Sequence, residues 1–135
     1  MFDLQSLPLP VIGAPMAGGP STPELAAAVS NAGGLGFLAG GYKSPAAVHE
    51  QVSRTRELTG QPFGLNIFVP DHANTYAEMS GEKQAAKLAA SLAYRDVLAA
   101  GTGQEPGLPD PADDDGWQAK LELALGERVP VVSFT

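Results

Sequence analysis

The sequence predicts an α/β fold in which parallel strands alternate with helices. Four short apolar segments have the composition of buried strands, and helix-spaced apolar residues lie between them. Glycine and proline separate these elements. Four such βα units either close a doubly wound domain or form half of an eight-stranded barrel. The length of 135 residues favours the doubly wound domain, because a whole barrel typically needs about 250 residues.

The first unit begins with the apolar pair Val11 and Ile12, a buried-strand signal followed by a glycine- and proline-rich turn. Ser21 with Glu24 three residues later indicates a helix N-terminus. The helix is expected from about residue 22 to residue 31, ending at a left-handed glycine cap. Its expected apolar stripe consists of Leu25, Ala28, Val29 and Ala32.

The second and third strands are expected at residues 35–38 and 63–69, both rich in apolar residues. Between them, Ser44 and Pro45 begin a helix that ends near Gly60. Residues 34–39 match the G-x-G-x-x-A dinucleotide fingerprint, but that motif requires a strand before it and a helix opening within it. Here a helix ends before the match and a strand lies inside it, so a dinucleotide site is rejected.

Asn66 interrupts the apolar third strand. A buried amide needs hydrogen-bond partners, because leaving it unsatisfied costs about 1–3 kcal/mol. Two interpretations stay open, namely that Asn66 bonds neighbouring backbone or that it faces a bound ligand with a polar edge. Its place near the carboxyl end of a strand is compatible with the ligand.

The last third of the chain adds two helices and a strand within one expected domain, residues 1–135. An alanine-rich helix is expected from about residue 81 to residue 99, followed by a flexible acidic, Gly/Pro-rich connection at 101–116. We expect Asp115 to cap a helix that contains Trp117 and ends at Gly126. The fourth strand is expected at residues 129–135.

Composition narrows the classes of partner. The net charge is −7 and the eight basic residues are scattered, which disfavours nucleic acid. The chain has no cysteine, so disulfides and thiolate metal sites are impossible, and no metal site is expected. The N-terminus lacks a secretory pattern and no apolar run approaches a membrane span. The sequence therefore predicts a soluble, cytoplasmic protein whose partners are small molecules or proteins.

The turn after the first strand has the composition of a ligand-binding loop. In α/β folds, ligands collect where strands end and helices begin. Gly18 and Gly19 let a flat ligand approach the backbone, and Met16 offers a polarizable apolar arm. The alternative is that glycine and proline only shape the turn.

These residues resemble the nitronate monooxygenases, formerly called 2-nitropropane dioxygenases. The resemblance is carried by P-V-I-G-A-P-M-A-G-G-P-S-T-P-E-L-A-A-A-V-S-N-A-G-G-L-G-F-L-A-G-G-Y at 10–42, by F-G-L-N-I-F-V-P at 63–70 and by V-V-S-F-T at 131–135. It implies the N-terminal half of a (β/α)8 TIM barrel, with about four βα units. It also implies an FMN-dependent oxidation of alkyl nitronates by dioxygen to a carbonyl compound and nitrite. By family pattern, Asn66 hydrogen-bonds the flavin, which lies against Ala14, Pro15, Met16 and Ala17.

The same resemblance places the catalytic histidine and the loops that grip the FMN phosphate beyond Thr135. His49 and His72 do not replace that histidine, so no catalytic residue is assigned in this chain. We therefore expect the 135 residues alone to be inactive and to bind FMN weakly. Open sheet edges predict pairing with a C-terminal half chain or self-association. The alternatives are a non-catalytic α/β assembly module and an FMN-dependent enoyl-acyl-carrier-protein reductase.

Overall fold

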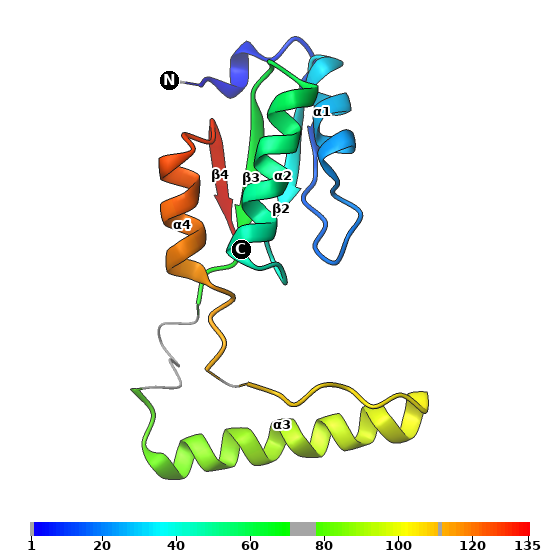
Figure 1. Cartoon of the computed structure of the whole chain (residues 1–135), viewed down its shortest axis with the longest axis vertical. Helices are drawn as coiled ribbons and strands as arrows, with labels where there is room; N and C mark the ends of the chain where they lie inside the picture. The colour runs from blue at the N-terminus through cyan, green and yellow to red at the C-terminus, as the bar shows by residue number, and fades with distance from the viewer. Residues whose placement is uncertain (1, 71–77, 111) are drawn as a thin grey trace. The chain divides into compact units, whose positions relative to one another are not determined.

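Four parallel strands form one sheet whose spatial order follows the chain, β1-β2-β3-β4 (Figure 1). The computed structural model describes residues 2–70, 78–110 and 112–135. The register aligns Ala39 with Asn66 and Asn66 with Ser133, so the carboxyl ends of the strands meet at one edge. The strands are β1 (Ile12–Gly13), β2 (Leu35–Ala39), β3 (Phe63–Ile67) and β4 (Val131–Phe134).

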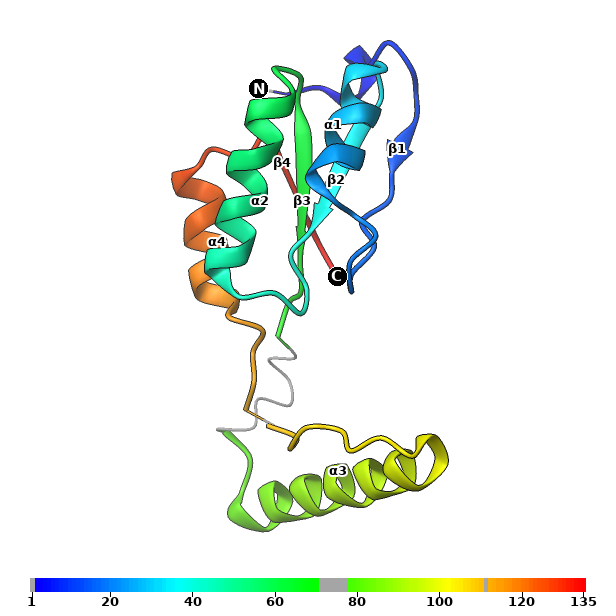
Figure 2. The ribbon, with the colours of Figure 1, turned by 45° about the vertical axis from the view of Figure 1, so that its right-hand side comes forward.

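Three helices cover one face of this sheet (Figures 1 and 2). They are α1 (Pro23–Asn31), α2 (Pro45–Leu58) and α4 (Trp117–Gly126), and a short 3-10 helix (Leu4–Ser6) precedes them. One core joins these helices to the sheet and includes Ala26, Leu38, Val52, Leu65 and Ala124. The doubly wound domain favoured by chain length is therefore wrong, because it needs helices on both faces and a reversal of strand order. A sheet in chain order, covered on one face, is part of a barrel wall.

Helix α1 packs closely on β2 through small residues. The structure buries Ala26, Ala27 and Ser30, whereas Leu25 of the expected stripe is 43% exposed. A Cβ added to Gly36 would lie 2.0 Å from the carbonyl oxygen of Ala26. The predicted stripe was wrong because close approach of two backbones selects alanine, serine and glycine rather than the bulkiest apolar side chains.

Hydroxyl groups cap the first two helices. Thr22 Oγ1 accepts a hydrogen bond from Leu25 N–H at 3.2 Å, and Ser44 caps α2 as expected through Ala47 N–H. The expectation that Ser21 begins α1 is therefore corrected by one residue. Gly33 adopts the predicted left-handed conformation, with φ of 98°.

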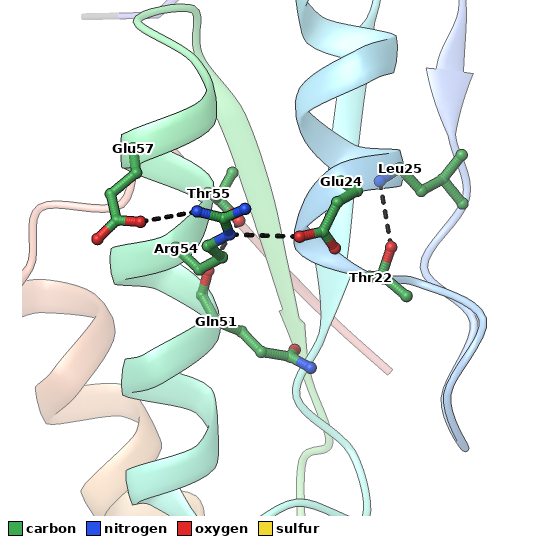
Figure 3. A network of polar contacts seen from close by, with 7 residues as sticks. All are labelled: Thr22, Glu24, Leu25, Gln51, Arg54, Thr55 and Glu57. Carbon is green, nitrogen blue, oxygen red and sulfur yellow. Dashed lines mark hydrogen bonds and ion pairs between the residues drawn. The ribbon is translucent and has the colours of Figure 1, made fainter.

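An ion-pair network joins α1 to α2. Figure 3 shows Arg54 between Glu24 of α1 and Glu57 of its own helix. Backbone hydrogen bonding and the Arg54 guanidinium lower the pKa of Glu24 below its ordinary value. The carboxylate of Glu57, which has the larger effect, and that of Glu24 both raise the pKa of Arg54. Because these groups are exposed, the network contributes little to stability.

Asp115 does not cap α4, which corrects the sequence prediction. The N-cap is Gly116 in a left-handed conformation, and no side chain caps the helix. Asp115 Oδ1 instead accepts a hydrogen bond from Tyr42 N–H at 2.9 Å, and Oδ2 lies 2.6 Å from Lys120 Nζ. The Lys120 side chain is only 1% exposed, so the start of α4 contains a buried ion pair. The hydrogen bond from Tyr42 N–H joins Asp115 to the loop after β2.

Residues Pro70–Asp114 form a second compact unit, and Met1–Val69 with Asp115–Thr135 form the first. The second unit contains α3 (Gly81–Thr102), which extends past the expected end near residue 99 and buries none of its residues. None of the helices in the described ranges has both the length and the apolar character needed to cross a membrane. His72 lies outside the described residues.

Candidate functional site

The two segments that the sequence singles out leave the sheet at the same edge. Gly13, the last residue of β1, pairs with Gly36 of β2. Three residues further along β2, Ala39 pairs with Asn66 of β3. The turn at residues 14–17 therefore begins on the carboxyl side of the sheet, where Asn66 also lies, and both lie in the first compact unit.

Asn66 faces away from the helices. Its strand neighbours Leu65 and Ile67 belong to the helix-side core, and side chains alternate between the faces of a strand. Gly64, two residues earlier, is on the same face as Asn66. It lies under the ring of Phe37, since a Cβ added to Gly64 would meet that ring at 2.3 Å. In a barrel, the face that the helices leave free is the interior.

The amide nitrogen of Asn66 bonds two hydroxyl groups. Asn66 Nδ2 donates to Ser133 Oγ at 3.0 Å and to Thr135 Oγ1 at 2.9 Å. The residue is 5% exposed, and the interpretation that its side chain bonds neighbouring backbone is wrong. Among the described residues, no hydrogen bond uses Asn66 Oδ1, so the side chain presents an acceptor. An acceptor in this position suits a ligand with an N–H or O–H edge.

The turn after β1 is held by a buried hydroxyl that sequence reasoning missed. Ser21 is 1% exposed, and its Oγ accepts a hydrogen bond from Met16 N–H at 2.8 Å. The same oxygen lies 3.5 Å from Ala14 O, to which it donates. The sequence offered one signal, namely that Ser21 and Thr22 are two adjacent hydroxyls where a helix cap needs one.

The outer part of the turn is open. Gly18 and Gly19 have φ angles of 84° and 134°, which favour glycine, and no atom lies within 4 Å of a Cβ added to either. Met16 is 43% exposed, and Ala14 is exposed, whereas Pro15 and Ala17 are half-buried. The turn thus has a fixed side toward Ser21 and a free apolar side that a flat ligand can cover.

Two other features lie apart from this edge. His49 is on α2 in the helix layer, with Nδ1 3.4 Å from Oε1 of Glu127, the residue that follows α4. A cavity of about 390 Å³ lies at the amino edge of the sheet, between Pro8, Gly34 and Pro62. Neither feature adds a group to the carboxyl edge.

Comparisons with known sequences agree on one family. A family model described as nitronate monooxygenase matches residues 3–135. A probable nitronate monooxygenase from Bacillus subtilis is 39% identical over 130 residues, which are 96% of this chain and 35% of that protein. One from Staphylococcus aureus is 33% identical, over 100% of this chain and 36% of its own length. The chain therefore spans about a third of the length of these relatives.

Comparisons with solved structures place the fold. The structure of nitroalkane oxidase from Streptomyces ansochromogenes superposes with a TM-score of 0.77 at 46% identity, over 97% of this chain and 35% of that one. FabK from Thermotoga maritima gives a TM-score of 0.58 at 27% identity, over 97% of this chain and 28% of that one. Both neighbours are TIM barrels, so the four parallel strands are the N-terminal half of such a barrel.

Proposed function

This chain belongs to the nitronate monooxygenase family, and on that premise we propose that it forms the N-terminal part of an FMN-dependent enzyme. The proposed reaction oxidises an alkyl nitronate with dioxygen to a carbonyl compound and nitrite. The observation that carries the proposal is the acceptor Asn66 Oδ1, which no hydrogen bond from the described residues uses, on the same sheet edge as an open apolar turn. That combination suits a flat heteroaromatic ring with N–H groups at its rim.

The residues present fit such a ring. The turn Ala14, Pro15, Met16 and Ala17 offers backbone and one polarizable side chain, and no charged side chain. Asn66 Oδ1 would accept a hydrogen bond from the ring and fix its orientation, while Ser133 and Thr135 hold the amide nitrogen away. When bound, FMN would supply the electron transfer between the nitronate and dioxygen. The protein's part is to bind the ring, orient it and exclude water from one face.

We assign no catalytic residue to this chain. The relatives are about three times as long, and we propose that the proton-transferring base and the phosphate-binding loops come from polypeptide equivalent to their remaining length. That polypeptide would complete the barrel either in the same chain or as a separate half. We also propose that the protein is cytoplasmic, that its substrate is a nitronate and that residues 1–135 form a single partial barrel domain.

The proposal is tested on the protein isolated from its host, by identifying released flavin and measuring nitronate-dependent oxygen uptake and nitrite. Replacing Asn66 by alanine should weaken FMN binding by about 1–3 kcal/mol, because one hydrogen bond to the ring is lost. Asn31→Ala is the matched control. That amide bonds Leu58 O and Thr59 Oγ1, so its loss should lower stability and leave flavin affinity unchanged.

Two outcomes would contradict the proposal. If the natural protein with its barrel completed held no flavin and consumed no oxygen, a non-catalytic α/β assembly module would be favoured. Bound FMN with reduction of an enoyl thioester, and no nitrite from a nitronate, would favour an enoyl-acyl-carrier-protein reductase, the alternative that the similarity to FabK weakly supports.

A further inference from the structure

We propose that Ser21 is a positioning residue for the ligand-binding turn at Ala14–Ala17. This inference rests on the proposed function and deepens it, because it names the group that fixes the shape of the turn. The hydroxyl is not used by α1, since the adjacent Thr22 caps that helix through Leu25 N–H. Ser21 is nevertheless buried, which sets it apart from the exposed Thr22.

One oxygen atom closes the inner side of the turn. Ser21 Oγ accepts a hydrogen bond from Met16 N–H, with 2.8 Å between the nitrogen and the oxygen. The Ser21 hydroxyl donates a second hydrogen bond to Ala14 O, with 3.5 Å between the two oxygens. A hydroxyl can do both because it carries one donor and two lone pairs. The two contacts fasten the backbone on either side of Pro15, and they direct the N–H of Met16 inward, away from any ligand.

No other side chain performs this task in the described part of the chain. The remaining hydrogen bond within residues 14–20 is a backbone contact, Thr22 N to Pro20 O. Gly18 and Gly19 have open space around them, so packing does not hold the outer half of the turn. The conformation of the turn therefore depends on Ser21, and a ring lying on the turn requires that conformation to be formed before binding.

The test compares two adjacent hydroxyl deletions in the holoprotein isolated from its host. Ser21→Ala should raise the dissociation constant for FMN about tenfold, the effect of one lost hydrogen bond. It should also change the visible circular dichroism of the bound flavin. Thr22→Ala removes a helix cap, so it should lower the melting temperature and leave both flavin measurements unchanged.

Hydrogen–deuterium exchange provides a readout that does not depend on flavin. Ser21→Ala should speed exchange in the peptide that contains Met16 and leave the first turn of α1 unchanged, and Thr22→Ala should do the reverse. Ser21→Thr keeps the hydroxyl and serves as a second variant, with flavin affinity expected within about twofold of the natural protein.

The outcomes separate the inference from the proposed function. If the natural protein binds flavin and Ser21→Ala binds it equally well with unchanged exchange at Met16, the positioning role is wrong and the proposed function stands. If Ser21→Thr binds as weakly as Ser21→Ala, the hydroxyl is not the cause and the inference also fails. A natural protein that holds no flavin although its barrel is complete would overturn both.

Discussion

Asn66 presents its carbonyl oxygen rather than its amide nitrogen on the free face of the sheet. Ser133 and Thr135 cause this orientation, because their hydroxyl oxygens accept hydrogen bonds from the amide nitrogen of Asn66. The register makes the arrangement specific, since Asn66 and Ser133 are paired residues of neighbouring parallel strands and share a face. The orientation of this hydrogen-bond acceptor thus depends on two strands far apart in sequence.

The ion pair of Asp115 and Lys120 gives a prediction about a single buried charge. Asp115→Asn should lower the free energy of unfolding by about 3–5 kcal/mol, because it leaves the ammonium of Lys120 buried without its counter-charge. Asparagine tolerates the left-handed backbone at this position, where φ is 58°, so the change tests charge rather than strain. The measurement is urea denaturation followed by circular dichroism.

Lys120→Met and the double variant, together with Asp115→Asn, form a double-mutant cycle that measures the interaction between the two charges. Lys120→Met should cost less than Asp115→Asn, because Asp115 is 20% exposed and keeps its hydrogen bond from Tyr42 N–H. The double variant should be more stable than Asp115→Asn alone. Additive losses in the double variant would show that the two charges do not interact.

The contact of α1 with β2 is set by glycine and alanine rather than by large apolar side chains. Gly36→Ala should destabilise the protein by about 3 kcal/mol, because the new methyl group would lie 2.0 Å from a carbonyl oxygen that only a shift of the helix can move. Gly126→Ala is the control, since nothing lies within 4 Å of a Cβ at the end of α4. It should leave stability unchanged or raise it by up to about 1 kcal/mol.

Both variants are compared by thermal and urea unfolding. If Gly36→Ala were as stable as Gly126→Ala, then α1 would be able to move away from β2 at no cost, and the close approach would not be what holds this helix. Crystals of the variant would then show the displaced helix.

Within the first compact unit, the outer strands of the half barrel have open edges and one sheet face has no covering layer. Val11 and Ile12 of the β1 edge are 55% and 52% exposed, and Phe134 of β4 is 54% exposed. Exposed apolar residues beside an open strand edge favour association with another copy. The 135-residue chain should therefore form larger species as its concentration rises.

Sedimentation velocity of three proteins tests this expectation. Ile12→Lys should shift the unmodified chain's distribution toward the monomer, because it places a charge at the β1 edge. Leu25→Lys adds the same charge to the outer side of α1, where the side chain is 43% exposed, and should leave association unchanged. A monomeric unmodified chain at all concentrations would contradict the prediction.

Local chemistry accounts for what could be predicted from the amino-acid order. The Ser44 cap with Pro45, the left-handed Gly33 and the starts of the apolar strands β2 and β3 depend on neighbours a few residues away, and the structure has them where they were expected. Strand β3 ends at Ile67, two residues before its expected end. The family resemblance likewise rests on short segments, and the family model confirms it. The flavin contacts of Asn66 and of residues 14–17 remain predictions.

Contacts between distant residues decided the rest. Chain length pointed to a doubly wound domain, whereas the order of the strands and the single helix layer make a barrel half. Asp115 accepts a hydrogen bond from Tyr42 N–H instead of capping α4, and Asn66 donates to the hydroxyls of Ser133 and Thr135. Which of several available partners a polar side chain takes depends on what packing brings within about 3 Å, and no local pattern in the chain contains that distance.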